Sequence, residues 1–307
     1  MALPIATATT AWVDTQSPCP HPWSPDVCPV CAPWQGELDQ AFERPGRVEA
    51  ALSAAEVGAL LQAQRGADKI ALRGGELLLR PEALELLTAA RRLAPQVELW
   101  SSGGHLARPG VAQALRQAGA TAVAIGLWGD SAEGHDYATG VPGSFARAIA
   151  GLKAARQAGL RTAVVAPLLR PTYRNLPQLM QKSLALAIDG ALLWAPAGPD
   201  RTQHPLLAPI ASMGPYVDAA ARVLAAGQKS FGVIGVAPCS LGPVAAALDL
   251  TPTAQPQLGR SKGAPCQSCS WAERCPGQSN PRIQLHGWVG LSPRRDGETT
   301  PELAARP

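Results

Sequence analysis

The sequence predicts an α/β protein in which a parallel β-sheet is followed by a small cysteine-rich metal-binding module. Three observations predict this fold class. Short apolar runs alternate with helix-length amphipathic runs, and several expected helices end in a glycine just before the next strand. This regularity stops after Pro238, where Pro, Gly and Cys accumulate. Alternating strands and helices imply a parallel sheet with crossover helices, and an open sheet and a barrel both fit this pattern.

The expected elements follow one another in a regular order. Residues 11–13 form a short strand candidate ahead of a loop that holds too many prolines for regular structure. Pro81 stands at a helix start, where apolar residues recur at helical spacing. Glycines at the ends of helices stop them in the left-handed conformation, as at Gly119, Gly159 and Gly190. The later strands are expected at residues 69–72, 97–100, 122–127, 162–166, 191–194 and 233–236, and the helices at residues 49–64, 81–93, 110–118, 144–158, 176–188 and 215–226.

Composition excludes several classes of protein. A chain of 307 residues can bury one large α/β core and still carry a small appendage. A net charge of +4, with three Tyr and three Phe, argues against nucleic-acid binding. No basic residue precedes Arg44, so the charged region of a secretory signal is missing, and Pro and Gly interrupt the uncharged stretch 230–248. We therefore expect a cytoplasmic protein with no membrane span.

The seven cysteines fall into two sets at opposite ends of the chain. In a reducing cytosol such sets favour metal ligation over disulfides. The first set has the spacing Cys-x8-Cys-x2-Cys and consists of Cys19, Cys28 and Cys31. The second has the spacing Cys-x26-Cys-x2-Cys-x5-Cys and consists of Cys239, Cys266, Cys269 and Cys275. Three thiolates leave one corner of a four-iron cube open, whereas four can close one.

Zinc is the alternative at both sets. In the first, His21 would complete a group of three thiolates and one imidazole, which is a usual zinc ligand set. In the second, four thiolates fit a zinc ribbon as well as a closed cube, because spacing alone does not distinguish the two.

A diglycine followed by an acid stands at the end of an expected strand, as Gly74, Gly75 and Glu76. Two glycines let a ligand approach the backbone without interference from a Cβ atom. The carboxylate of Glu76 could accept hydrogen bonds from a bound ammonium group. Taken alone, the same residues fit an ordinary glycine-rich turn with an exposed Glu.

The order of these features resembles the start of radical SAM enzymes, over at least residues 11–196. That order is strand, cysteine loop, helix, strand, Gly-Gly-Glu and helix. Residues 99–103 (LWSSG) resemble the segment of that family that ends its third strand, and residues 125–130 (IGLWGD) resemble its fourth-strand segment. The sequence departs from the usual pattern in its long first cysteine gap and in Leu77, where the family usually has Pro after Gly-Gly-Glu.

The resemblance implies a partial (β/α)6 TIM-like barrel with its active site at the carboxyl ends of the strands. It implies that the three cysteines of the first set bind a [4Fe-4S] cluster whose fourth iron chelates S-adenosylmethionine. One electron, from a donor such as flavodoxin or ferredoxin, would cleave this cofactor to a 5′-deoxyadenosyl radical that abstracts hydrogen from a substrate. The cofactor-binding residues implied are Gly74, Gly75, Glu76, Ser101 and Ser102. No side chain is assigned a catalytic role.

The second cysteine set resembles the SPASM and twitch extensions that carry auxiliary clusters in this family. A full SPASM pattern would have another Cys where Ser279 stands, so one auxiliary [4Fe-4S] cluster is the better fit. We expect a barrel domain over residues 1–230, an auxiliary-cluster module over 231–282 and a loosely held tail over 283–307. The resemblance favours a ribosomally made peptide or protein as substrate. The alternatives are an enzyme of small-molecule or cofactor biosynthesis, and a non-catalytic barrel with zinc sites that acts as a binding module.

Two further groups of residues are candidates for the substrate pocket. Trp100, Trp128 and Trp194 lie near expected strand ends, where they could form a pocket wall or pack in the core. His135 and Asp136 follow the fourth strand and could approach substrate, or lie in an ordinary loop over residues 130–143.

Overall fold

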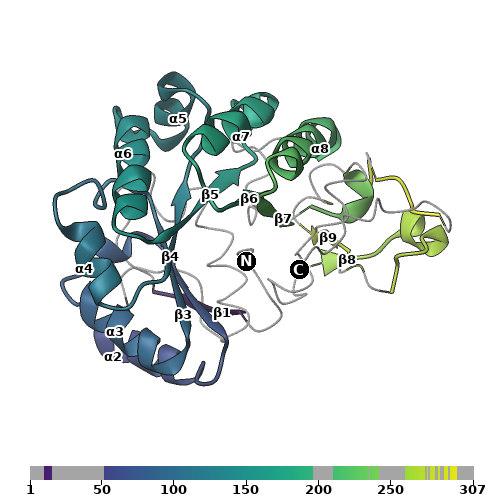
Figure 1. Cartoon of the computed structure of the whole chain (residues 1–307). Helices are drawn as coiled ribbons and strands as arrows, with labels where there is room; N and C mark the ends of the chain where they lie inside the picture. Colours follow the sequence, from purple (N-terminus) through teal and green to yellow (C-terminus); the bar gives the residue numbers. More distant parts are fainter. Residues whose placement is uncertain are drawn as a thin grey trace.

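The computed structural model describes residues 10–15, 52–195, 210–234, 236–241 and 260–273, and shorter stretches at 275, 277–280, 283, 287–289 and 291–295. A sheet of seven parallel strands runs in sequence order from β1 to β7. Figure 1 shows this sheet curled into part of a barrel, with the helices on its outer side. The partial (β/α) barrel predicted from the sequence is therefore confirmed.

The strands are short and begin and end close to their expected positions. They are β1 (Thr10–Asp14), β2 (Lys69–Arg73), β3 (Gln96–Ser101), β4 (Ala122–Gly126), β5 (Arg161–Pro167), β6 (Gly190–Trp194) and β7 (Ser230–Ile234). The helices that cover them are α2 (Ala54–Gln62), α3 (Ala83–Leu93), α4 (Val111–Gln117), α5 (Ala132–Thr139), α6 (Ser144–Gln157), α7 (Leu176–Ala185) and α8 (Ile210–Ala226).

The core lies between the sheet and the outer helices. On β3, Val97 and Leu99 are fully buried and belong to this core. Because successive side chains of a strand point to opposite faces, Glu98 and Trp100 face the inner, concave side of the sheet. Strand β3 therefore buries apolar residues outward and leaves a charged and an aromatic side chain for the inside of the barrel.

Three elements differ from their expected positions. Residues 132–139 form helix α5 instead of part of a loop, and Ser131 caps its start by accepting a hydrogen bond from the backbone N–H of Gly134. Helix α8 begins at Ile210 and carries Pro215 in its interior, although Pro215 was expected near its first turn. Strand β7 occupies Ser230–Ile234 instead of residues 233–236.

The C-terminal residues form a small separate layer of structure. Strand β8 (Arg260–Ser261) pairs antiparallel with β9 (Gln278–Ser279), and the 3-10 turn η4 (Ala264–Ser268) lies between them in sequence. A second 3-10 turn, η3 (Pro238–Ser240), follows β7. Within the described residues, no helix is both long enough and apolar enough to cross a bilayer.

Candidate cofactor site

The backbone after β2 turns sharply at Gly74 and Gly75. Both residues are left-handed, with φ of 89° and 67°, a conformation that strains any residue with a Cβ atom. Glu76 returns to an extended conformation and begins the 3-10 turn η1 (Leu77–Leu79). Two successive left-handed glycines leave a backbone surface that a ligand can approach closely, so the geometry fits a bound amino group.

Thr15 fastens the end of β1 to this turn. Its backbone N–H donates to the carbonyl of Arg73 at 2.7 Å. Its hydroxyl lies 3.1 Å from the carbonyl oxygens of both Arg73 and Gly74. The described stretch 10–15 therefore ends beside the diglycine turn. The first cysteine set itself, Cys19, Cys28 and Cys31, lies outside the described residues.

Glu76 joins the diglycine turn to the end of β3. Its side chain is fully buried, and the single hydroxyl proton of Ser101 is shared between the two carboxylate oxygens, with Oγ 3.0 Å from Oε1 and 2.9 Å from Oε2. Ser102 donates to the same carboxylate twice, from its backbone N–H at 2.8 Å and from its hydroxyl at 2.7 Å. A weaker bond comes from the N–H of Leu78 at 3.4 Å. The structure thus brings together all five residues expected to bind the cofactor.

Most of the hydrogen bonds that Glu76 can accept come from other residues of the protein. An ionised carboxylate has about four acceptor positions, and the two serines fill most of them. We expected Glu76 to accept directly from an ammonium group, whereas here its carboxylate fixes the turn and places a buried negative charge beside it.

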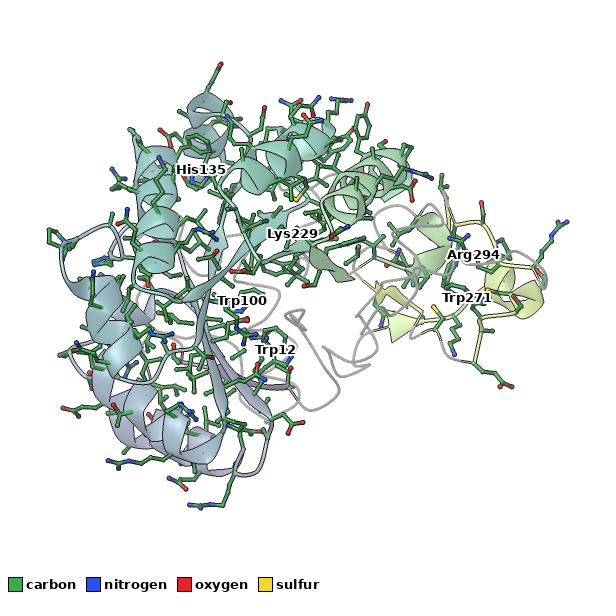
Figure 2. The ribbon with its side chains drawn as sticks, in the orientation of Figure 1. Trp12, Trp100, His135, Lys229, Trp271 and Arg294 are labelled. Atoms are coloured by element: carbon green, nitrogen blue, oxygen red, sulfur yellow. The ribbon has the colours of Figure 1, made fainter. Side chains whose placement is uncertain are left out.

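Charged and aromatic side chains cover the inner face of the first three strands. Glu98 pairs with Lys69 at 2.9 Å, and both are almost fully buried. Glu98 also accepts from the indole N–H of Trp100 at 2.7 Å. The Trp100 ring meets Trp12 edge to face with centroids 5.3 Å apart, and the Arg73 guanidinium lies 4.7 Å above the Trp12 ring. Figure 2 shows Trp12 and Trp100 on the concave side of the sheet.

The sequence predicts Trp100 as a pocket candidate but not Trp12, which forms the edge-to-face pair with it, here called the Trp12–Trp100 corner. The signal was available in the sequence, since Lys69, Glu98 and Trp100 occupy alternate-face positions of otherwise apolar strands. A charged residue in a buried strand needs a partner, and here the two charges pair with each other.

His135 stabilises the chain between β4 and α5. It is buried, its Nδ1 atom accepts from the backbone N–H of Trp128 at 3.0 Å, and its ring packs against Phe145. Trp128 is also buried, at 5% exposure. Both residues therefore act as packing and hydrogen-bonding groups of this connection.

Asp136 caps the start of α6 from the preceding helix. Its carboxylate accepts from the backbone N–H groups of Gly143 at 2.6 Å and Phe145 at 2.8 Å, and from the Ser144 hydroxyl at 2.9 Å. Partial burial raises the pKa of Asp136, but these three hydrogen bonds outweigh it and lower the pKa below its usual value. The expectation that Asp136 approaches substrate is therefore replaced by a structural role.

The second cysteine set is gathered at the C-terminal layer. All four thiols are half-buried. Burial is the main cause that raises the pKa of Cys239 to about 12, and the three other thiols, Cys275, Cys269 and Cys266, raise it further. The Cys275 sulfur accepts a hydrogen bond from the N–H of Gly277 at 3.4 Å.

These features fit sulfur ligation of a metal centre. Backbone N–H groups that point at cysteine sulfurs are a usual feature around iron-sulfur clusters and other thiolate sites. The Cys239 thiol, whose pKa is raised, needs a bound cation to become a thiolate near neutral pH. Among the described residues, however, no three His, Cys, Asp or Glu side chains stand at metal-ligating separations. The structure therefore brings the four cysteines into one region without forming a coordination geometry.

Arg294 ties this region to the barrel. Its guanidinium donates to the carbonyls of Pro238 at 2.9 Å and Leu241 at 2.6 Å, on either side of Cys239. It also lies 5.5 Å from the ring centroid of Trp271. Figure 2 shows Arg294 and Trp271 together in the C-terminal layer.

Curated relatives match part of the chain. An AdoMet-dependent heme synthase of Oleidesulfovibrio alaskensis is 30% identical over 48% of this chain and 39% of its own length. A GTP 3',8-cyclase of Petrotoga mobilis is 32% identical over 43% of this chain and 40% of its own length. An AdoMet-dependent heme synthase of Methanosarcina barkeri is 36% identical over 28% of this chain and 25% of its own length. The chain thus spans less than half the length of these relatives.

Solved structures share the fold. Streptococcus suis SuiB bound to the precursor peptide SuiA superimposes with a TM-score of 0.54 at 14% identity, over 73% of this chain and 48% of SuiB. Native anSMEcpe with bound AdoMet gives a TM-score of 0.51 at 12% identity, over 72% of this chain and 64% of its own. The sequence profile of the Radical SAM superfamily matches residues 19–182, which is more than half of the chain. With the partial barrel and the Gly-Gly-Glu turn beside β1, this match shows that the chain belongs to the radical SAM superfamily.

Proposed function

We propose that this enzyme binds a [4Fe-4S] cluster in the segment after β1 and S-adenosylmethionine at the diglycine turn. The cluster ligands are the three cysteines of that segment, Cys19, Cys28 and Cys31. The observation that carries the proposal is the position of the turn, which Thr15 holds to β1 and Glu76 holds to β3. The end of β1 and the turn are thus fixed at the same edge of the sheet, where parallel barrels carry their active sites.

The residues of the turn have separate roles. The backbone of Gly74 and Gly75 holds the amino group of the cofactor, because no Cβ atom blocks its approach. Glu76 favours the same ammonium group through its nearby negative charge, and Ser101 and Ser102 keep that carboxylate in place. When bound and reduced, the family's cluster and cofactor supply a 5′-deoxyadenosyl radical that abstracts hydrogen from the substrate. A small redox protein such as flavodoxin or ferredoxin supplies the electron.

The four C-terminal cysteines hold an auxiliary [4Fe-4S] cluster in this proposal. Their mutual proximity and the N–H of Gly277 aimed at the Cys275 sulfur support it. Four ligands close the cube, so this cluster has no open iron for S-adenosylmethionine. The alternative is that the same four cysteines bind one zinc ion, as in a zinc ribbon.

The substrate that we propose is a ribosomally made peptide or protein. The proposal rests on the resemblance of the C-terminal cysteines to the modules found in peptide-modifying members. The likeness to SuiB, whose structure holds a precursor peptide, agrees in fold with such a role. The concave inner face of the sheet, with its Trp12–Trp100 corner, is the surface that such a substrate would contact.

A second candidate is a small-molecule or cofactor substrate. It is favoured by the curated relatives, which are named for heme synthesis and for GTP cyclisation. A short precursor peptide encoded beside the gene separates the two candidates. Incubation of that peptide with reduced enzyme and S-adenosylmethionine should change the peptide mass if the first candidate holds.

Anaerobic reconstitution with iron and sulfide tests the metal assignment. We expect a brown protein with about eight irons, from four per cluster, and matching acid-labile sulfide. With dithionite and S-adenosylmethionine it should release 5′-deoxyadenosine. Stoichiometric zinc without acid-labile sulfide would overturn the catalytic proposal and favour the non-catalytic alternative.

A further inference from the structure

A cavity of about 470 Å³ opens between the loop after β3 and the start of α6. Both segments follow the carboxyl ends of strands, β3 and β4, so the cavity lies on the face of the barrel that holds the candidate cofactor site. Its lining residues come from these two segments and include Ser102, His105, Arg108, Val141, Ser144 and Arg147. Ser102 is shared, because it also donates to Glu76.

A close backbone approach fixes the shape of this cavity. A Cβ atom on Gly151 of α6 would lie only 2.2 Å from the carbonyl oxygen of Gly103, so the loop after β3 rests directly on the helix. Gly103 itself is left-handed, with φ of 83°, and a Cβ there would meet the backbone of Ala148 at 3.0 Å. The loop therefore sits close against α6, the neighbour of α4 in the outer layer (Figure 1).

The lining carries positive charge and no carboxylate. Arg108 and Arg147 are exposed to solvent within it, and His105 is half-buried. One N–H of Arg147 donates to the carbonyl of Pro142 at 3.2 Å, which holds that side chain over the cavity rim. In the part of the chain that the structure describes, the side chains of Arg108 and His105 make no hydrogen bond or ion pair. Their donors remain available to a ligand.

Two carboxylates lie next to the cavity without lining it, those of Glu76 and Asp136. Glu76 is fully buried behind Ser102, and its oxygens accept from Ser101 and Ser102. Asp136 is not among the lining residues, and its carboxylate is used by the N–H groups of Gly143 and Phe145 and by the Ser144 hydroxyl. These bonds already satisfy the start of α6. The excess donors in the cavity are therefore the two guanidinium groups, which suit oxyanions because each presents a planar fork of N–H groups.

From this juxtaposition we infer that the cavity binds an oxyanion of the substrate, a carboxylate or a phosphate, between Arg108 and Arg147. A group held there is anchored beside Ser102, next to the turn at which the cofactor is proposed to bind. The anchor would fix which hydrogen atom of the substrate faces the cofactor site. Its use for substrate rests on the proposed function, whereas the binding of the anion itself does not.

Calorimetric titration of the purified holoprotein at constant ionic strength tests the anion site. The probes are inorganic phosphate and glutarate, with chloride as the balancing anion. We expect saturable binding of at least one probe, weakened about tenfold or more by Arg108→Gln and by Arg147→Gln, since each removes a charged donor. The control is Arg92→Gln, because Arg92 is an exposed arginine in the last turn of α3, at the opposite end of the barrel. It should leave binding unchanged.

The two probes identify the chemistry. Tighter binding of phosphate indicates a phosphorylated substrate, and tighter binding of glutarate indicates a carboxylate such as an acidic side chain. Absence of saturable binding by both probes, or equal binding by the Arg108 and Arg147 variants and the wild type, overturns the inference. Release of 5′-deoxyadenosine by the same proteins reports on the proposed function separately, and we expect it to persist in both variants.

Discussion

Glu76 is a buried carboxylate stabilised by hydrogen bonds from two serines at the end of the neighbouring strand. Such donors lock the side chain in one position. The negative charge is thereby held beside the diglycine turn without being exposed to water. A cation bound at the turn would feel this charge strongly, because little solvent separates them.

Replacing Glu76 by Ala should weaken the binding of S-adenosylmethionine by about 1.5 to 3 kcal/mol, since opposite unit charges roughly 6 to 10 Å apart attract by about this much at an effective dielectric constant of about 20. It also leaves the donors of Ser101 and Ser102 without their acceptor. Iron content should stay unchanged, because no cysteine is altered. Calorimetric titration measures the affinity, and Glu85→Ala is the control, since Glu85 is an exposed acid in the first turn of α3. Equal affinities of Glu76→Ala and wild type would remove Glu76 from the site.

Asp136 gives a prediction about pH. Its pKa is lowered in the folded protein, so its contribution to stability is present above the unfolded pKa, about 3.9, and is lost as the pH falls through the folded value. Asp136→Asn should therefore lower the free energy of unfolding by about 1 kcal/mol at neutral pH, as the loss of a helix cap does. The difference from wild type should shrink as the pH falls below about 4. A difference that stays constant over this range would show that the charge of Asp136 does not stabilise α6.

At the scale of the elements, replacing a helical glycine by alanine should lower the free energy of unfolding at one position and raise it at another. Gly151 of α6 lies against the carbonyl of Gly103, and a Cβ there would approach it to 2.2 Å. Gly58 of α2 has no atom within 4 Å of its Cβ position. Gly151→Ala should destabilise the fold by about 1 to 3 kcal/mol through overpacking, whereas Gly58→Ala should stabilise it by about 0.5 to 1 kcal/mol. Chemical denaturation of the two variants measures both changes. Stabilisation by Gly151→Ala would show that the loop after β3 does not rest on α6.

The order of strands and helices could be predicted because strands and helices have different periodicities of apolar residues, and because several helices end at a glycine. Helix α5 could not, since its residues 132–139 include Gly134 and few apolar side chains, and it is defined by a cap at Ser131 and a left-handed Gly140. The sequence predicts that α8 begins at Pro215, because proline is common in the first turn of a helix. In the structure the helix begins at Ile210, and Pro215 lies inside it.

The residues of the candidate site could be predicted from the sequence, but the hydrogen bonds between them could not. The spacing of Gly74–Glu76 and of residues 101–102 placed these segments at the ends of adjacent strands. That Ser101 and Ser102 would donate to the Glu76 carboxylate depends on the register of β2 and β3 and on side-chain positions. Neither is encoded in a local pattern, and the same holds for the cavity between the loop after β3 and α6.

At the scale of the whole molecule, the two cysteine sets divide the work of the proposed enzyme. All seven cysteines are assigned as ligands, three to the open cluster and four to the closed one. No cysteine remains to donate a hydrogen atom to a substrate radical. The 3-10 turn η3, which contains Cys239 of the second set, follows the end of β7. Helix α8 packs on this turn, because a Cβ on Gly214 would lie 2.4 Å from the carbonyl oxygen of Ser240. The auxiliary cluster would thus lie at the edge of the barrel, where it could position the substrate or accept its electron.

Single replacements in the two sets should therefore separate two measurable steps. Cys269→Ala should abolish product formation and preserve the release of 5′-deoxyadenosine, because the open cluster stays intact. Cys31→Ala should abolish both, because it removes a ligand of the cluster that delivers the electron. Liquid chromatography of 5′-deoxyadenosine after anaerobic incubation with dithionite measures the first step, and iron content per chain shows that each variant has lost about four irons of eight. Release of 5′-deoxyadenosine by Cys31→Ala at the wild-type rate would mean that the cluster of the reaction lies elsewhere than in the segment after β1.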